Sequence, residues 1–201
     1  DLSDDAPNLP NIMAYCRQHG TENSVLQFAS TSKVTFAGAG VAFLASSANN
    51  LKIITQHLGV ASIGPDKVNQ LRHLNVIPDL AGLKSHMKKH AELLRPRFAC
   101  VIQHLCEHFA ESDLGDWNSP EGGYFISFDT RPGLADEVVK LSAEAGVKLT
   151  PAGATFPYGK DPENKNIRIA PSFPTVDEID KAMAIFCNSV KLASVRQKLA
   201  A

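Results

Sequence analysis

The chain has 201 residues, of which 44% are hydrophobic and 20% are charged. This is the composition of an ordinary globular protein, long enough for one large domain or two small ones. The formal net charge of −1 gives no electrostatic basis for binding nucleic acid or an anionic membrane. A long uncharged stretch, residues 34–50, is broken by glycine, serine and threonine and is too short to span a membrane. We therefore expect neither nucleic acid nor a membrane as a partner.

The first part of the chain alternates between strand and helix patterns. Short apolar runs predict strands at residues 25–29 and 41–45, both buried. Capping residues and apolar spacing predict helices at residues 8–19, 48–57 and 66–74. The acidic start, Asp1 to Asp5, has no initiating methionine, so we expect the chain to be part of a longer protein.

The second part begins with a long predicted helix, from residue 83 to about residue 110, interrupted near Pro96. The apolar pattern then predicts three strands and two helices. The strands are residues 124–129, 147–150 and 166–170, and the helices are residues 135–145 and 176–199. We place a boundary near residue 82: residues 1–82 finish a larger α/β layer, and residues 83–201 form a compact α+β domain.

The cysteines and histidines are candidate metal ligands. The four cysteines form no C-x-x-C pair, so reduced thiols in a cytoplasmic protein are the simplest interpretation. Two histidine pairs, 86/90 and 104/108, are spaced four apart on predicted helices, close to Cys100 and Cys106. A zinc site needs three or four converging ligands, often within an H-E-x-x-H frame, and that frame is missing. The sequence therefore predicts no metal site.

A loop between the first two predicted strands carries one lysine, Lys33, in an otherwise uncharged stretch. If the strands are buried, a lysine between them is costly unless it is paired or modified, and desolvation favours the neutral, nucleophilic amine. Ser30, Ser32 and the glycines that follow offer hydroxyl and backbone N–H groups suited to a phosphate dianion. An amine that captures an aldehyde beside a phosphate site suggests pyridoxal phosphate. From spacing alone, an ordinary surface lysine remains the alternative.

The predicted strand at residues 166–170 carries an arginine between two isoleucines. Strand alternation buries Ile167 and Ile169 and places Arg168 on the opposite face. A guanidinium matches a carboxylate with two parallel hydrogen bonds and fixes its orientation. Arg168 is therefore a candidate carboxylate-binding residue, and a surface ion pair is the alternative.

Three segments in order, STSKVTFAGAGVAF (30–43), IGPDKVNQLRH (63–73) and NIRIAPSFP (166–174), resemble the fold type I, pyridoxal-phosphate-dependent aminotransferases of class I/II. They are similar in particular to the bacterial aspartate aminotransferases once grouped with MocR-type proteins. The resemblance extends from Asn8 to Leu192. It implies an α/β fold in which residues 1–82 are the C-terminal portion of the cofactor-binding large domain. Residues 83–201 would be the small C-terminal domain.

The resemblance also implies chemistry. Lys33 would hold pyridoxal 5'-phosphate as an internal aldimine, Ser30 and Ser32 would bind its phosphate, and Arg168 would bind the substrate α-carboxylate. The expected reaction is transamination, most simply L-aspartate with 2-oxoglutarate to oxaloacetate and L-glutamate. An aminotransferase for another amino acid, or the cofactor-sensing domain of a MocR-type regulator, are the alternatives. A cytoplasmic homodimer is expected, with residues 63–73 facing the partner subunit.

The chain departs from the family pattern in two places. The arginine that usually follows the lysine and pairs with the phosphate is absent, because residues 40–42 are Gly-Val-Ala. Lys67 and Arg72 are candidates to replace it, to bind the distal carboxylate of a substrate, or simply to lie on a helix surface. The family's other cofactor-binding residues precede the lysine and are not in this chain, so we expect it to be the C-terminal half of an enzyme.

Overall fold

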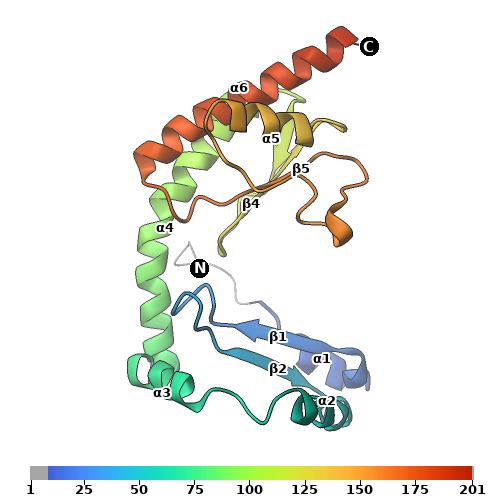
Figure 1. Ribbon diagram of the computed structural model, residues 1–201, viewed down its shortest axis with the longest axis vertical. Helices are drawn as coiled ribbons and strands as arrows, with labels where there is room; N and C mark the ends of the chain where they lie inside the picture. The colour runs from blue at the N-terminus through green and yellow to red at the C-terminus, as the bar shows by residue number, and fades with distance from the viewer. Residues whose placement is uncertain (1–8, 201) are drawn as a thin grey trace. The chain divides into compact units, whose positions relative to one another are not determined.

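The computed structural model describes residues 9–200, which divide into two compact units, residues 9–90 and 91–200. The division falls within the long helix α4 (Leu80–Phe109), whereas the sequence predicted a domain boundary after residue 82. The assignment of these units to two domains of a larger enzyme stays a prediction. Each unit is described by itself (Figure 1).

The first unit is built around a two-stranded antiparallel hairpin. Strand β1 (Leu26–Ser30) pairs with β2 (Ala42–Ser46), with Leu26 opposite Ser46 and Ser30 opposite Ala42. Both predicted strands are confirmed. The helices of this unit are α1 (Ile12–Gln18), α2 (Ala48–Ala61) and α3 (Lys67–Val76), and a short 3-10 turn, η1, spans Glu22–Ser24.

Side-chain caps fix where these helices begin. The Asn11 side chain accepts hydrogen bonds from the first turn of α1, Ser47 caps α2, and Asp66 caps α3. Each cap satisfies backbone N–H groups that have no partner inside the helix. The three predicted helices are therefore confirmed, although the predicted start at Asn8 lies outside the described residues.

The expected burial of the hairpin is wrong. All five residues of β1 are exposed, and Phe28 and Phe43 keep 72% and 57% of their surface accessible. Within residues 9–200 the two strands pair only with each other, so the described part of the chain provides little cover for either face. An apolar strand pattern shows that a strand needs burial, but it cannot show which part of a protein covers it.

The second unit packs three helices with a three-stranded antiparallel sheet of order β3-β4-β5. The strands are β3 (Gly115–Trp117), β4 (Ile126–Thr130) and β5 (Asn166–Ile169). The helices are the rest of α4, α5 (Ala135–Glu144) and α6 (Val176–Ala200), and a 3-10 turn, η2, spans Pro157–Gly159. α5 and α6 lie side by side (Figure 1).

An aromatic group on β4, α4 and α6 forms the centre of this unit's core. The Phe128 ring meets Phe186 edge-on at 5.1 Å and Phe109 at 5.6 Å between centroids, and all three are almost fully buried. Gly115 on β3 makes room for this group, because a Cβ there would lie 2.2 Å from Cζ of Phe128. The core therefore ties the sheet to helices that are distant in sequence.

Two predictions about this unit are wrong. Helix α4 continues through Pro96, because Leu94 and Phe98 on either side are buried in the core and packing offsets the missing backbone bond. Residues 147–150 form no strand. The Val147 N–H instead donates to the Ser142 carbonyl at the end of α5, and Leu149 packs against the core. The three-residue strand β3 was not predicted.

Among residues 9–200, no helix is both long enough and apolar enough to cross a membrane. All four cysteines carry free thiols.

Candidate active site

The loop that carries Lys33 closes on itself at its base. The Thr31 N–H donates to the Val41 carbonyl at 2.9 Å, and the Val41 N–H donates to the Thr31 hydroxyl at 2.8 Å. These bonds extend the pairing of β1 and β2 by one step. The two ends of the loop are therefore held together next to the β1–β2 hairpin.

Two serine hydroxyls meet beside the lysine. Oγ of Ser30 lies 2.6 Å from Oγ of Ser32 and also accepts the Ser32 N–H at 3.1 Å. Gly40 passes so close that a Cβ there would lie 2.4 Å from Oγ and 2.9 Å from Cα of Ser32. The hydroxyl pair is thus packed against a position that only glycine can occupy without a shift.

Lys33 lies in the turn that follows this pair, and it is exposed. The premise that the lysine is buried between buried strands is therefore wrong for this chain. Its position next to the two hydroxyls does not depend on that premise.

Side chains of helix α3 form hydrogen bonds with the lysine loop. The His73 ring receives two interactions there: Nε2 lies 2.8 Å from Oγ1 of Thr35 and 3.3 Å from Oγ1 of Thr31. Nδ1 lies 2.8 Å from the Asn69 carbonyl, and a carbonyl can only accept, so Nδ1 carries the proton and Nε2 accepts from a threonine hydroxyl. The Asn69 side chain donates to the Ala39 carbonyl at 2.8 Å.

A second histidine reaches the residue next to the lysine. His86, on the first turns of α4, places Nε2 2.6 Å from the Val34 carbonyl. Nε2 of His90 lies 3.2 Å from Nε2 of His86, and burial, followed by the His86 charge, lowers the pKa of His90. No sequence pattern pointed to a role for His73, and His86 was a candidate only as a metal ligand, because contacts between segments so far apart leave no local pattern.

The two candidate cations lie on α3. Arg72 stands 6.0 Å from the centre of the Phe36 ring, within cation–π range. Lys67 is the first residue of the helix and is exposed. Arg72 is thus directed to the lysine loop, while no described contact gives Lys67 a role.

Arg168 occupies the face of β5 that strand alternation predicted. Ile167 and Ile169 are buried, and Arg168 is half-buried. Its guanidinium lies 4.4 Å from the centre of the Phe125 ring, and Nη2 is 3.5 Å from Oγ1 of Thr150. Nε is fully buried and has no hydrogen-bond partner among the described residues. The side chain lines a cavity of about 150 Å³.

Asp161, which was not predicted as a site residue, holds the start of β5. The Asp161 carboxylate accepts the backbone N–H groups of Glu163, Lys165 and Asn166 at 2.8–3.0 Å. Burial alone would raise its pKa, but these three donors hold the pKa of Asp161 below its ordinary value. Asp161 therefore sets the position from which β5 carries Arg168.

The structure thus brings Ser30, Ser32 and Lys33 together in the first unit and places Arg168 in the second.

Comparison with known proteins identifies the family. The family model described as aspartate amino-transferase matches residues 1–201. An aspartate aminotransferase of Corynebacterium glutamicum is 45% identical over 193 residues, which are 96% of this chain and 45% of that protein. The crystal structure of an aspartate transaminase from the same organism is 44% identical, with a TM-score of 0.91 over 98% of this chain and 46% of the other.

A more distant structure shares the fold. The α-aminoadipate aminotransferase of Thermus thermophilus, solved in complex with N-(5'-phosphopyridoxyl)-L-leucine, is 19% identical, with a TM-score of 0.78 over 94% of this chain and 47% of that chain. The chain thus spans a little less than half the length of the relatives it matches. Its mixed α/β architecture is that of the corresponding part of fold type I aminotransferases. The chain belongs to the aspartate amino-transferase family.

Proposed function

We propose that this chain is the C-terminal part of a pyridoxal-phosphate-dependent aminotransferase that moves an amino group between an amino acid and a 2-oxo acid. The observation that carries the proposal is Arg168, whose half-buried guanidinium rests on Phe125 and keeps a buried Nε without a described partner. A desolvated planar cation with unused donors suits a carboxylate ligand. In this family, that ligand would be the substrate α-carboxylate.

The residues of the lysine loop fit the cofactor. The Ser30 and Ser32 hydroxyls already converge, and the close approach of Gly40 holds them in place. We propose that they would bind the phosphate and that Nζ of Lys33 would bond the aldehyde carbon. When bound, pyridoxal phosphate supplies an electron sink for the substrate Cα–H bond. The phosphopyridoxyl ligand of the Thermus thermophilus enzyme supports this assignment.

Lys33 has a second role in this proposal. With the substrate amine bound to the cofactor in place of Lys33, the free Nζ of Lys33 would accept a proton from the substrate α-carbon. Proton transfer requires a defined approach, since small displacements of a catalytic group reduce rates strongly. The hydrogen bonds from His73 on α3 and His86 on α4 to the lysine loop restrict its position.

Arg168 orients the substrate. Two parallel hydrogen bonds to one carboxylate would fix the rotation of the α-carbon, so that its C–H bond points in one direction. The ring of Phe125 under the guanidinium restricts the side chain before a ligand arrives. Aspartate and 2-oxoglutarate are the substrates we propose, supported by the name of the Corynebacterium glutamicum relative.

We also propose that the enzyme is a homodimer in which residues 63–73 face the partner subunit. Ile63, Val68 and Leu71 in this segment are exposed apolar residues, while His73 and Asn69 bond to the lysine loop. The segment could therefore link the two subunits to the site. Arg72 and Lys67 would then be available for a phosphate or a distal carboxylate near that surface.

Amino-acid half-reactions of the full-length protein test the reaction. Stoichiometric addition of aspartate should change the absorption of the bound cofactor, and 2-oxoglutarate should reverse that change. A cofactor spectrum that no amino acid alters would refute transamination and favour a sensing role.

A further inference from the structure

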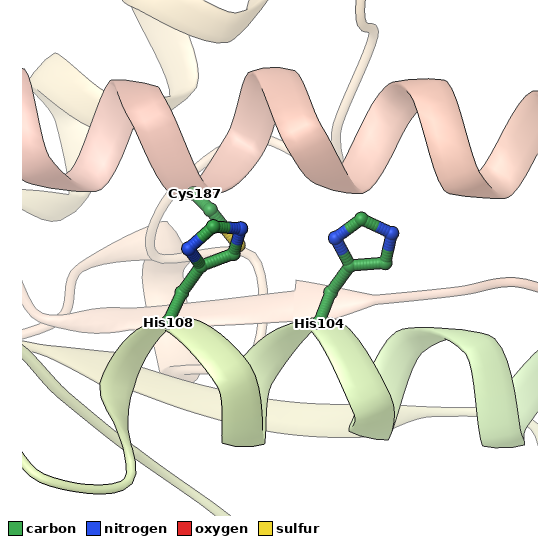
Figure 2. Close-up of side chains that lie close together, drawn as sticks. All are labelled: His104, His108 and Cys187. Carbon is green, nitrogen blue, oxygen red and sulfur yellow. The ribbon is translucent and has the colours of Figure 1, made fainter.

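A group of histidine and cysteine side chains lies outside the proposed active-site residues, between α4 and α6 of the second unit. His104 and His108 are one turn apart on α4, and Cys187 faces them from α6 (Figure 2). One potential ligand atom from each of the three lies within 4.8 Å of the others. Cys187 is fully buried, and the two histidines are half-buried.

Hydrogen bonds determine which atoms face this group. Nε2 of His104 lies 2.8 Å from a carboxylate oxygen of Asp180, which can only accept, so Nε2 carries the proton. Nδ1 of His104 then carries a lone pair, and this atom is buried with no hydrogen-bond partner among the described residues. In Figure 2 both rings extend from α4, and the nitrogen of His104 nearer to His108 is Nδ1. The other ring nitrogen, Nε2, is the one bonded to Asp180.

The ring of His108 offers its other nitrogen. Nζ of Lys191 donates to Nδ1 at 2.9 Å, which leaves Nε2, next to Cys187 in the same view. Two ring nitrogens and one thiol sulfur are therefore available as ligands in this group.

We propose that His104 Nδ1, His108 Nε2 and Cys187 Sγ bind a borderline-soft divalent cation, with Zn²⁺ as the natural occupant. Two imidazoles and a thiolate are a preferred donor set for zinc. Zinc bonds of about 2.0–2.3 Å place tetrahedral ligand atoms about 3.3–3.8 Å apart, so side-chain movements on the order of 1 Å would close the group around the ion. A water molecule would complete the coordination.

Asp180 gives this group a feature typical of metal sites. A histidine ligand commonly donates its other N–H to a carboxylate, which fixes the ring and strengthens the bond to the metal. His104 and Asp180 already have that arrangement. The H-E-x-x-H frame, whose absence led to the prediction of no metal site, describes two histidines on one helix. It does not include a cysteine 79 positions beyond the second histidine (187 − 108).

Lys191 opposes the ion. Metal on Nε2 moves the ring proton of His108 to Nδ1, and the Lys191 ammonium must then turn away. Lys191→Gln would replace the ammonium with an amide whose carbonyl oxygen can accept a hydrogen bond from the Nδ1–H of His108. The variant should therefore bind the cation more tightly, by about tenfold or more, which is the usual size of such supporting interactions.

Titration of the full-length protein with Co²⁺ and Zn²⁺ tests the proposal, with spectra recorded as differences from the same protein without metal. We expect one Co²⁺ per chain, a thiolate-to-cobalt band, visible bands of tetrahedral intensity, and loss of all of them on adding Zn²⁺. Cys187→Ser should abolish the thiolate band, and Asp180→Ala should weaken binding about 10- to 100-fold. Cys106→Ser, on the exposed face of α4, and His57→Gln, on α2, are matched controls that should leave the spectrum unchanged.

Three outcomes would overturn the site: no tetrahedral spectrum, a thiolate band that persists in Cys187→Ser, or loss of the band in the controls. Because Cys187 is buried, circular dichroism and thermal unfolding must show that Cys187→Ser is folded. His108→Gln, at a half-buried position, provides a second test with less risk to the core. Zinc should raise the melting temperature of the unaltered protein and leave that of His108→Gln unchanged, and an equal rise in both would also refute the assignment.

Discussion

Gly40 offers a direct test of how the lysine loop is built. In Gly40→Ala the new Cβ would lie 2.4 Å from Oγ of Ser32, and also 2.9 Å from its Cα and 3.0 Å from its N. The hydroxyl could rotate away, but the backbone atoms cannot. The loop must therefore move by several tenths of an ångström, and Ser32 loses its fixed position beside Ser30.

The expected cost follows from this geometry. Overpacking a site that cannot expand costs about 1–3 kcal/mol, and about 1.4 kcal/mol is tenfold in a binding constant. If the hydroxyl pair binds the cofactor phosphate, Gly40→Ala should weaken pyridoxal phosphate binding by about tenfold or more. Equilibrium dialysis of the apo full-length protein measures this affinity.

Gly59→Ala is the matched control. A Cβ at Gly59, in α2, meets no atom within 4 Å. The substitution should stabilise the helix by about 0.5–1 kcal/mol and leave cofactor affinity unchanged. If Gly40→Ala binds the cofactor as tightly as the unaltered protein, the interpretation of the loop as a rigid phosphate site is wrong.

Three further predictions concern single residues or pairs. Replacing both Ser30 and Ser32 by alanine should weaken cofactor binding by about 1.5–3 kcal/mol for each charge-assisted bond lost, and unchanged affinity in dialysis would show that other groups hold the phosphate. Arg168→Ala should lower kcat/KM by an amount that corresponds to a loss of about 3–5 kcal/mol of transition-state stabilisation, while the absorption of the bound cofactor is retained. Arg168→Lys should be only partly active because lysine lacks the planar guanidinium. Normal kinetics in both variants would make Arg168 a structural residue. The depressed pKa of Asp161 means that its stabilisation is present above the unfolded value of about 3.9 and is lost as pH falls through the folded value. Asp161→Asn should therefore lower the melting temperature at neutral pH, with a difference that shrinks below about pH 4, and a difference independent of pH would contradict this.

The secondary structure was largely predictable because local chemistry determines it. Asp66 and Ser47 cap α3 and α2, and the alternation around Arg168 correctly placed two isoleucines inside and the arginine on the other face. Residues 147–150 show the limit. Their composition suits a strand, but a strand exists only when another strand pairs with it, and that depends on the tertiary fold.

The surroundings of the candidate site were less predictable for the same reason. The contacts of His73 and His86 with the lysine loop join positions that a linear pattern does not relate. Burial was misjudged at Lys33 and at the hairpin, because the apolar pattern reports the need for cover and not its source. The motif still located the lysine beside its two hydroxyls, since those neighbours are adjacent in sequence.

The most direct test of the central proposal is to find the lysine that carries the cofactor. Full-length protein with bound pyridoxal phosphate would be reduced with borohydride, digested, and analysed by mass spectrometry. We expect a phosphopyridoxyl group on the peptide containing Lys33 and no label in Lys33→Ala. A label on any other lysine, or labelling that survives in Lys33→Ala, would contradict this proposal.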